Sequence, residues 1–217
     1  MGKAANRSCA RPPGRSKPSK PQALKKTLVK LARAQKRRAV KKPHVVSEGK
    51  GLVKGLVLGQ APPGPRKSLP RAWRPLAGPA EQRLARLAKL SVAEFWQHYD
   101  RANLLSWYPG LKTRSERHDV SKGYKLHTSD GDVFPMDQAK MAAAKLELAK
   151  YRSVLLLGTS VARAFGVSKP LLHTETRGQT RLLVFPHPSG VSHYWNDPKN
   201  TQKAAKALRR ELRAMRR

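Results

Sequence analysis

Short apolar runs bounded by glycine, proline and polar residues recur along the chain. Three of them, residues 51–58, 153–157 and 180–185, have the length and composition of buried strands. A fourth buried strand is predicted at 103–110, where the chain leaves the sheet through a Pro-Gly turn. These runs predict a small sheet whose strands are joined by polar segments.

Apolar residues at helical spacing fill the intervals between those runs. Leu84, Leu87 and Leu90 mark one face of a helix, and Ser91 opens a second helix as its N-cap. Glu94 stands three residues after Ser91, which is the spacing of a capping box. The second helix has an aromatic side that we assign to the core rather than to base stacking, formed by Phe95, Trp96 and Tyr99.

Three more helices are predicted further along the chain. One is rich in alanine and covers 137–151, and a shorter one covers 159–166, with Thr159 or Ser160 as its cap. A basic helix runs from 199 to 217. Strands that alternate with helices form mostly parallel sheets covered on both faces. We therefore expect a three-layer α/β/α sandwich around a central, mostly parallel, four-stranded sheet.

The charge of the chain limits what it binds. Lys and Arg total 46 against 13 Asp and Glu in 217 residues, a formal net charge of +33. A positive charge of this size opposes the compact state through self-repulsion, and it attracts polyanions. Nucleic acid is therefore the leading partner. An acidic membrane surface, or a protein made basic by its tails alone, are the alternatives.

The cations are dense at both ends of the chain. Residues 1–48 carry Lys and Arg throughout, with Glu48 as their one acidic residue. Such a segment buries too little apolar surface to fold alone. We predict a disordered arm at 1–48 that grips DNA phosphates, a folded domain at 49–198 and a basic C-terminal helix at 199–217. A solubility or targeting tail is the alternative for the arm.

Cysteine content and hydropathy exclude several classes of protein. Cys9 is the one cysteine, which excludes an intrachain disulfide and a cysteine-held iron–sulfur cluster. His118 and His127 have no neighbours at metal-ligand spacing, so no metal site is predicted. No apolar run approaches the roughly 20 residues that span a bilayer. We expect a cytoplasmic or nucleoid protein, prokaryotic or viral, and the Arg-rich start leaves an organelle address open.

Two predicted strands end in loops rich in glycine and proline. The loop from Gly59 to Gly64 reads GQAPPG, and the loop at 185–197 reads FPHPSGVSHYWND. In an open α/β sheet, loops at the carboxyl ends of parallel strands lie side by side and form the ligand crevice. The two loops therefore predict one ligand site built from distant parts of the sequence.

With Arg101-Ala102-Asn103-Leu104-Leu105 between them, these loops resemble the motifs of the uracil-DNA glycosylase superfamily. The first motif of that family is a G-Q-x-P loop and the second an H-P-S loop, and their order and spacing match over about residues 52–197. The resemblance implies a three-layer α/β fold and a monomer that needs no cofactor. It also implies an enzyme that flips a nucleotide out of DNA and hydrolyses its N-glycosidic bond.

The resemblance implies roles for three polar side chains. His187 matches the histidine that donates a hydrogen bond to O2 of the departing base, where negative charge develops. Asn103 matches the asparagine that reads the pyrimidine edge, and Gln60 of the first motif is the third catalytic candidate. A loop histidine satisfied by backbone groups, and a polar cap on a strand end, are the alternatives for His187 and Asn103.

The second loop also matches positions that hold the DNA backbone in the family. Ser189, Gly190 and Ser192 are expected to donate amides and hydroxyls to the phosphates beside the flipped nucleotide. Val191 is expected to wedge into the space that this nucleotide leaves in the stack.

The first motif departs from the G-Q-D-P-Y of the family's best-known branch. Ala61 stands where that branch has the aspartate that acts on water, and Pro63 stands where it has the tyrosine that excludes C5 substituents. The segment Arg74-Pro75-Leu76 resembles the R-P-F segment of the family's iron–sulfur branch. Leu76 replaces the aromatic residue that is expected to stack on the base, and Trp73 could supply a ring instead. The base pocket is expected to be lined by Ala61, Pro62, Pro63, Leu76 and Trp73.

These departures leave three functions open. The first is excision of uracil with His187 as the dominant catalyst. The second is excision of a 5-substituted or hypermodified pyrimidine, which would make the protein an anti-phage defence or viral-conflict enzyme. The third is a non-catalytic, ribosome- or nucleoid-associated nucleic-acid-binding protein that retains the glycosylase fold. The intact Pro-Ser-Gly sequence after His187 favours an enzyme.

Overall fold

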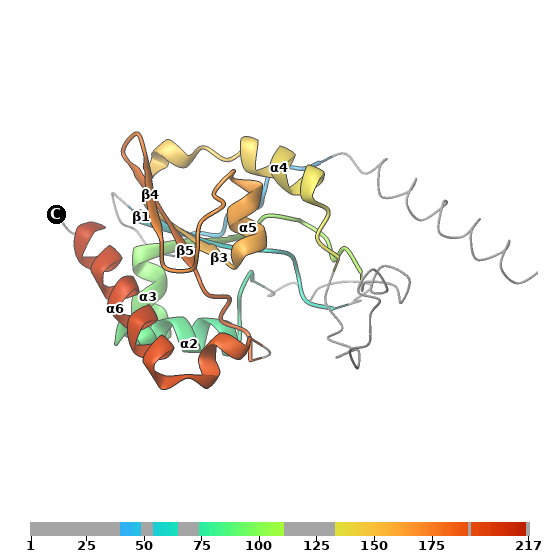
Figure 1. Cartoon of the computed structure of the whole chain (residues 1–217). Helices are drawn as coiled ribbons and strands as arrows, with labels where there is room; N and C mark the ends of the chain where they lie inside the picture. Colours follow the sequence, from blue (N-terminus) through green and yellow to red (C-terminus); the bar gives the residue numbers. More distant parts are fainter. Residues whose placement is uncertain (1–39, 49–53, 65–73, 111–132, 191, 216–217) are drawn as a thin grey trace, which may run out of the picture. The chain divides into compact units, whose positions relative to one another are not determined.

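The structure is a computed structural model that describes residues 40–48, 54–64, 74–110, 133–190 and 192–215. The described residues all belong to one compact unit, Val40–Arg217 (Figure 1). Three predicted features lie outside the described residues: the arm up to residue 39, Trp73 and Val191.

A five-stranded sheet forms the centre of this unit, in the order β2-β1-β3-β5-β4. Four strands are parallel, and β4 runs antiparallel to β5 at one edge. The strands are β1 (Lys54–Gly59), β2 (Tyr99–Asn103), β3 (Tyr151–Leu157), β4 (Thr174–Arg177) and β5 (Thr180–Phe185). The predicted mostly parallel sheet is confirmed, but the prediction of four strands is wrong by one.

The unpredicted strand is β4, which reads TETR and is half-buried to exposed. It pairs with β5 as a hairpin in which Arg177 faces Thr180, leaving a two-residue turn that begins at Gly178 with φ of 58°. A positive φ at this place is typical of the turns that join hairpins. Because β4 buries no apolar run, periodicity gave no signal for it.

Helices cover both faces of the sheet, so the predicted three-layer sandwich is confirmed (Figure 1). On one face, α4 (Met136–Ala144) and α5 (Thr159–Ala164) pack on strand residues such as Leu56 and Leu156. On the other face, α2 (Pro79–Ala88), α3 (Val92–His98) and α6 (Pro198–Met215) pack on Val57, Leu155 and Leu183. Alternate strand residues therefore point to opposite faces of the sheet and belong to two separate cores.

The capping box predicted at the second helix is present. Ser91 Oγ accepts from Glu94 N at 3.2 Å, and Glu94 Oε2 accepts from Ser91 N at 2.8 Å. The aromatic side of this helix lies in the core as expected, with the exception that Tyr99 is the first residue of β2. Its ring stacks on Phe95 with centroids 5.0 Å apart. Tyr99 therefore packs in the same core as Phe95 and Trp96 but belongs to β2.

Two predicted boundaries are wrong for local reasons. The strand placed at 103–110 is β2, which ends at Asn103; Asp100 and Arg101 are polar but buried, so they concealed the strand. The helix placed at 137–151 ends at Ala144 and is followed by the 3₁₀ turn η1 (Leu148–Lys150). The helix α5 is capped by Gly158 rather than by Thr159 or Ser160.

The basic C-terminal helix packs on the sheet as α6. Its buried side carries Ala204, Leu208 and Leu212, and Glu211 on the same side is fully buried. The Glu211 carboxylate accepts from Nε and Nη2 of Arg181, both at 3.0 Å. This paired charge fixes the last turns of α6 against the start of β5.

Candidate active site

The carboxyl ends of the parallel strands meet at one edge of the sheet. Gly59, the last residue of β1, is in register with Asn103, the last residue of β2. Leu157, the last residue of β3, is in register with Phe185, the last residue of β5. The two loops predicted to share a site therefore leave the sheet at the same edge, as parallel strands require.

Gly158 lies between the two loops. A Cβ atom built on Gly158 would stand 3.7 Å from His187 Cβ and 3.8 Å from Gln60 Nε2. Gly158 N–H donates to Phe185 O at 2.8 Å, and its φ of 89° favours glycine. The structure thus brings Gln60 and His187 together around a residue without a side chain.

Asn103 closes the same edge from β2. Its side chain is buried, and its Oδ1 would lie 2.4 Å from a Cβ built on Gly59. No described residue donates a hydrogen bond to this oxygen. An unpaired buried acceptor costs about 1–3 kcal/mol, and ligand sites are where such groups are kept. Leu104 N–H donates to Gly59 O and Leu105 N–H to Gln60 O, both at 2.9 Å, which locks the two motifs together.

The imidazole of His187 is oriented by its own loop. Ser189 N–H donates to His187 Nδ1 at 3.3 Å, and the indole Nε1–H of Trp195 donates to His187 O at 2.8 Å. A nitrogen that accepts a hydrogen bond carries no proton, so the neutral ring carries its proton on Nε2. The half-buried His187 therefore presents a donor at Nε2.

The family model of the uracil DNA glycosylase superfamily matches residues 46–212. The chain belongs to this superfamily. The resemblance drawn from the motifs over about residues 52–197 is thereby confirmed, and the matched range includes most of α6. Membership supports a DNA glycosylase-type function in general, because members of the superfamily act on DNA. No curated protein matches the chain.

The residues predicted to line the base pocket differ in burial and in distance from this edge of the sheet. Leu76 is half-buried, has a φ of 64° and would lie 2.8 Å, through Cδ2, from a Cβ on Gly59. Ala61 is half-buried and packs against the core, Pro62 is buried, and Pro63 is exposed. Leu76 therefore stands beside Gly59 and Asn103, while Pro63 faces solvent.

The positions that match the superfamily's phosphate ligands lie on the loop after His187. Ser189 and Ser192 are half-buried and Gly190 is exposed. Ser192 N–H donates to Ser189 O at 3.4 Å, so the loop turns back on itself. Phosphate binding by these residues stays a prediction.

An ionic cluster from four segments supports the turn that carries Leu76. Arg101, with 3 % of its side chain exposed, donates to Glu81 Oε2 at 2.8 Å and pairs with Glu48. Glu48 also binds Arg74 at 2.9 Å. Glu81 Oε1 in turn accepts from Gly78 N–H at 2.8 Å. The cluster holds both ends of the turn Arg74–Gly78 and so fixes Leu76 between them.

Glu81 is ionised within this cluster. Burial alone would raise the pKa of Glu81, but hydrogen bonds from Gly78 N–H, Trp96 and Arg101 outweigh it and hold the pKa below its usual range. Trp96 Nε1–H donates to Glu81 Oε2 at 3.0 Å, and Arg101 lies 4.5 Å over the Trp96 ring. Sequence patterns gave no sign of this cluster, because its members are distant in sequence.

Five aspartates are candidates for a supplementary carboxylate near the site: Asp100, Asp119, Asp130, Asp132 and Asp137. The first of them is Asp100. It lies in β2 opposite Leu56, three residues before the strand end, and accepts from Tyr151 Oη at 3.2 Å. Burial first, and then the neighbouring Asp100, raise the pKa of Tyr151 to about 12. Among the other candidates, Asp137 is exposed in the first turn of α4. The remaining three, Asp119, Asp130 and Asp132, lie outside the described residues.

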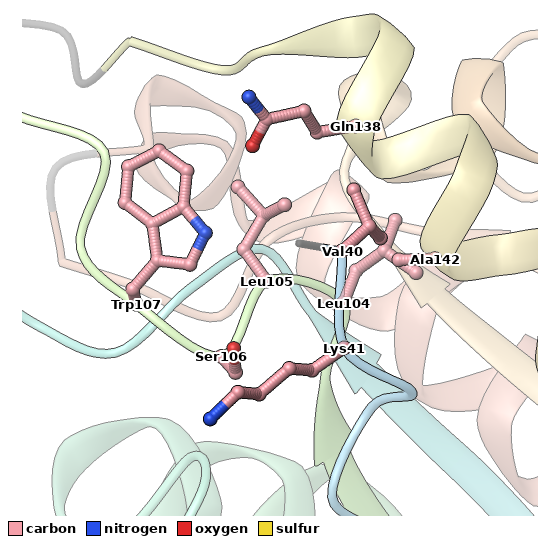
Figure 2. A pocket seen from close by; sticks show the side chains of 8 residues that line it. All are labelled: Val40, Lys41, Leu104, Leu105, Ser106, Trp107, Gln138 and Ala142. Carbon is pink, nitrogen blue, oxygen red and sulfur yellow. The ribbon is translucent and has the colours of Figure 1, made fainter. Parts of the chain in front are cut away.

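A small cavity lies beside Leu104 and Leu105, the two residues that follow Asn103. Figure 2 shows the side chains of Leu105, Trp107 and Gln138 around it. It offers about 10 Å³ of free volume, which is the threshold for one water molecule. A pyrimidine does not fit there.

The described part of the chain has neither a metal-binding cluster nor a membrane-spanning helix. Those residues hold no group of three or more His, Cys, Asp or Glu side chains arranged for a metal ion. None of their helices is long and apolar enough to cross a membrane.

Proposed function

We propose that the protein is a monofunctional DNA glycosylase that flips out a pyrimidine nucleotide, hydrolyses its N-glycosidic bond and leaves an abasic site. The observation that supports this most directly is the convergence of Gln60, Asn103 and His187 at the carboxyl ends of β1, β2 and β5. All three come from one chain, so a monomer suffices, and the reaction needs no cofactor.

His187 supplies the electrostatic part of the reaction. When the glycosidic bond breaks, the base leaves with negative charge on O2 and the sugar gains oxocarbenium character. A fixed donor at O2 stabilises that charge more in the transition state than in the substrate. The Ser189 N–H bond to His187 Nδ1 supports this role, because it leaves Nε2–H as the outward donor.

Asn103 recognises the base. Its Oδ1 is buried and receives no hydrogen bond from the described residues, so a ligand N–H would remove the penalty. N3–H of a uracil-type pyrimidine is such a donor, and the adjacent O4 suits the amide Nδ2–H. An amide therefore reads both atoms of that edge. Gln60, beside Gly158, is placed to contact the same nucleotide.

The substrate is uracil or a pyrimidine with a larger C5 substituent. The second choice is supported by the first motif, in which Ala61 is small and Pro63 is exposed. Neither provides the ring that excludes C5 substituents in the family's best-known branch. Excision of hypermodified bases from viral DNA would give the protein an anti-phage role.

A panel of duplexes tests this proposal. Each carries one uracil, hydroxymethylated pyrimidine or glucosylated pyrimidine, and abasic sites are detected by alkaline cleavage. We expect release of one class of base. Release of uracil alone would remove the hypermodified-base proposal, and release of none would leave the non-catalytic nucleic-acid-binding protein as the better account. That alternative is favoured by Ala61, which removes the carboxylate that acts on water.

DNA is held by exposed cations of α6 as well as by the basic arm that precedes the compact unit. Five exposed cations of α6 recur at intervals of four, three, four and three residues and so share one face: Lys199, Lys203, Lys206, Arg210 and Arg213. The 18 residues of α6 extend about 27 Å. The one acidic residue of the helix, Glu211, is buried against Arg181, and of the five cations it pairs only with Arg210, at 3.8 Å. This arrangement suits a row of phosphates.

Replacing Lys203, Lys206 and Arg213 together by glutamine is expected to reduce the salt dependence of DNA binding. Each phosphate contact contributes about −0.9 to the slope of log K against log salt, so the slope should become shallower by up to about 2.7. Fluorescence anisotropy on an unmodified duplex from low to moderate salt measures it.

A matched variant changes the same net charge on the other face of the sheet. It carries glutamine at Lys140, Arg163 and Lys169, which are exposed on α4, on α5 and after α5. Its slope should stay close to that of the parent protein. Equal changes in both triple variants would show that only net charge matters and that α6 is no binding surface.

A further inference from the structure

Two side chains outside the motifs hold the backbone of the loop that carries His187. Arg83 of α2 donates through Nη1 to Pro188 O at 2.9 Å and to Ser189 O at 3.0 Å. Trp195 of η2 (His193–Asn196) donates through Nε1 to His187 O at 2.8 Å. Three consecutive carbonyls of the loop are therefore bonded by these two residues.

The two side chains also support each other. The guanidinium carbon of Arg83 lies 5.2 Å from the centroid of the Trp195 ring, which is cation–π distance. The same ring packs at 6.4 Å from Phe185, the last residue of β5, and at 5.0 Å from Tyr194. Arg83 is half-buried and thus holds a defined position against the loop.

The contact with Pro188 O acts on the histidine through a single peptide unit. No described peptide bond is cis, and in a planar trans peptide the C=O and N–H point in opposite directions. Arg83 binds the C=O of the Pro188–Ser189 peptide, and the N–H of that peptide donates to His187 Nδ1 at 3.3 Å. Fixing the carbonyl on one side therefore aims the amide at the imidazole on the other.

We propose that Arg83 is a positioning residue for His187. Through the Pro188–Ser189 peptide it keeps Nδ1 as an acceptor and Nε2–H directed at the base. The positive guanidinium also polarises the peptide, which strengthens the N–H donor. This inference rests on the proposed function, in which Nε2–H of His187 stabilises the departing base.

The first test compares Arg83→Gln with Arg83→Lys. Single-turnover base release is measured with enzyme in excess, alongside the Kd for a duplex without a target base. Arg83→Gln should lower the rate by about 10–100-fold, the effect of displacing a catalytic group by about 1 Å, and change Kd little. Arg83→Lys should recover much of the rate, because an ammonium still donates to these carbonyls.

Arg86 provides a matched control on the same helix. It is exposed on α2, so Arg86→Gln removes the same charge without touching the loop, and its rate should equal that of the parent. Weaker binding by Arg83→Gln with an unchanged rate would show a phosphate ligand and overturn the proposal. Urea unfolding of each variant identifies loss of the fold, and if Arg83→Gln unfolds, the comparison is made with Arg83→Lys and Trp195→Phe.

The second test asks whether Arg83 acts through His187. In a His187→Ala background, Arg83→Gln should cause no further loss of rate, because the group that it positions is absent. Additive losses would mean that Arg83 acts elsewhere and would overturn the inference. If His187→Ala alone left base release intact, the proposed function itself would fail, which separates the two failures.

The third readout is the tautomer of His187, seen in the ¹⁵N spectrum of the labelled imidazole. The parent protein should show the proton on Nε2, and Arg83→Gln should show both tautomers. A residue that merely stabilised the fold would leave this spectrum unchanged, so an unaltered tautomer in a folded Arg83→Gln variant contradicts the proposal.

Discussion

Replacing His187 by alanine is expected to lower the rate of base release by about 10²–10³-fold, the usual cost of removing one donor from a developing oxyanion. The reason lies in the loop geometry: Ser189 N–H donates to Nδ1, which assigns the proton of the neutral ring to Nε2, the donor that the proposed function uses. The rate is measured by single-turnover cleavage of the duplex that the parent protein processes. The Kd for DNA should hardly change, because the donor acts mainly in the transition state.

His193→Ala is the control for this experiment. His193 is an exposed histidine in η2, six residues further on, and its loss should change the rate by less than about twofold. A variant of His187 that released base at the parent rate would remove the histidine from the chemistry. Loss of binding together with rate would instead identify His187 as a structural residue of the loop.

Much of this fold could be predicted because its central strands are apolar throughout. The predicted strands at 153–157 and 180–185 correspond to β3 and β5, since both are buried on two faces and contain few polar residues. The two edge strands of the sheet, β2 and β4, were harder to predict. The strand β2 contains the polar residues Asp100, Arg101 and Asn103, all of them buried, and β4 has no apolar residue.

The candidate site could be predicted in its members but not in its supports. Gln60, Asn103 and His187 follow from motif order, and parallel strands bring the motifs to one edge. Arg83 contacts residues about a hundred positions further on, and Glu48 pairs with Arg101, which is 53 positions away. On a helix as basic as α2 such an arginine looks like any solvated residue. Long-range partners of this kind leave no local pattern.

Under the proposed function, the unpaired acceptor on Asn103 is a place where the protein gives up stability for recognition. A group that binds a base must be desolvated and unpaired before the base arrives. Gly59 makes this possible, because a side chain at this position would collide with the Asn103 amide. Asn103 Oδ1 should therefore lower the stability of the free protein, and base release should depend on it.

Replacing Asn103 by leucine, which has a similar branched shape, is expected to separate these two effects. Base release should fall by about 10²-fold or more, because both hydrogen bonds to the pyrimidine edge are lost. The free energy of unfolding should stay the same or rise by up to about 1–2 kcal/mol, since a buried unpaired acceptor is removed. Single-turnover cleavage and urea unfolding of the same preparation measure the two quantities.

The same substitution at a satisfied asparagine supplies the comparison. Asn200 is half-buried and donates through Nδ2 to Tyr194 O at 3.4 Å, so Asn200→Leu should lower the free energy of unfolding. If Asn103→Leu destabilised the protein as much as Asn200→Leu, the Asn103 amide would be a structural cap on β2. Opposite signs at the two positions, with base release lost only at Asn103, are what a preorganised base-reading group requires.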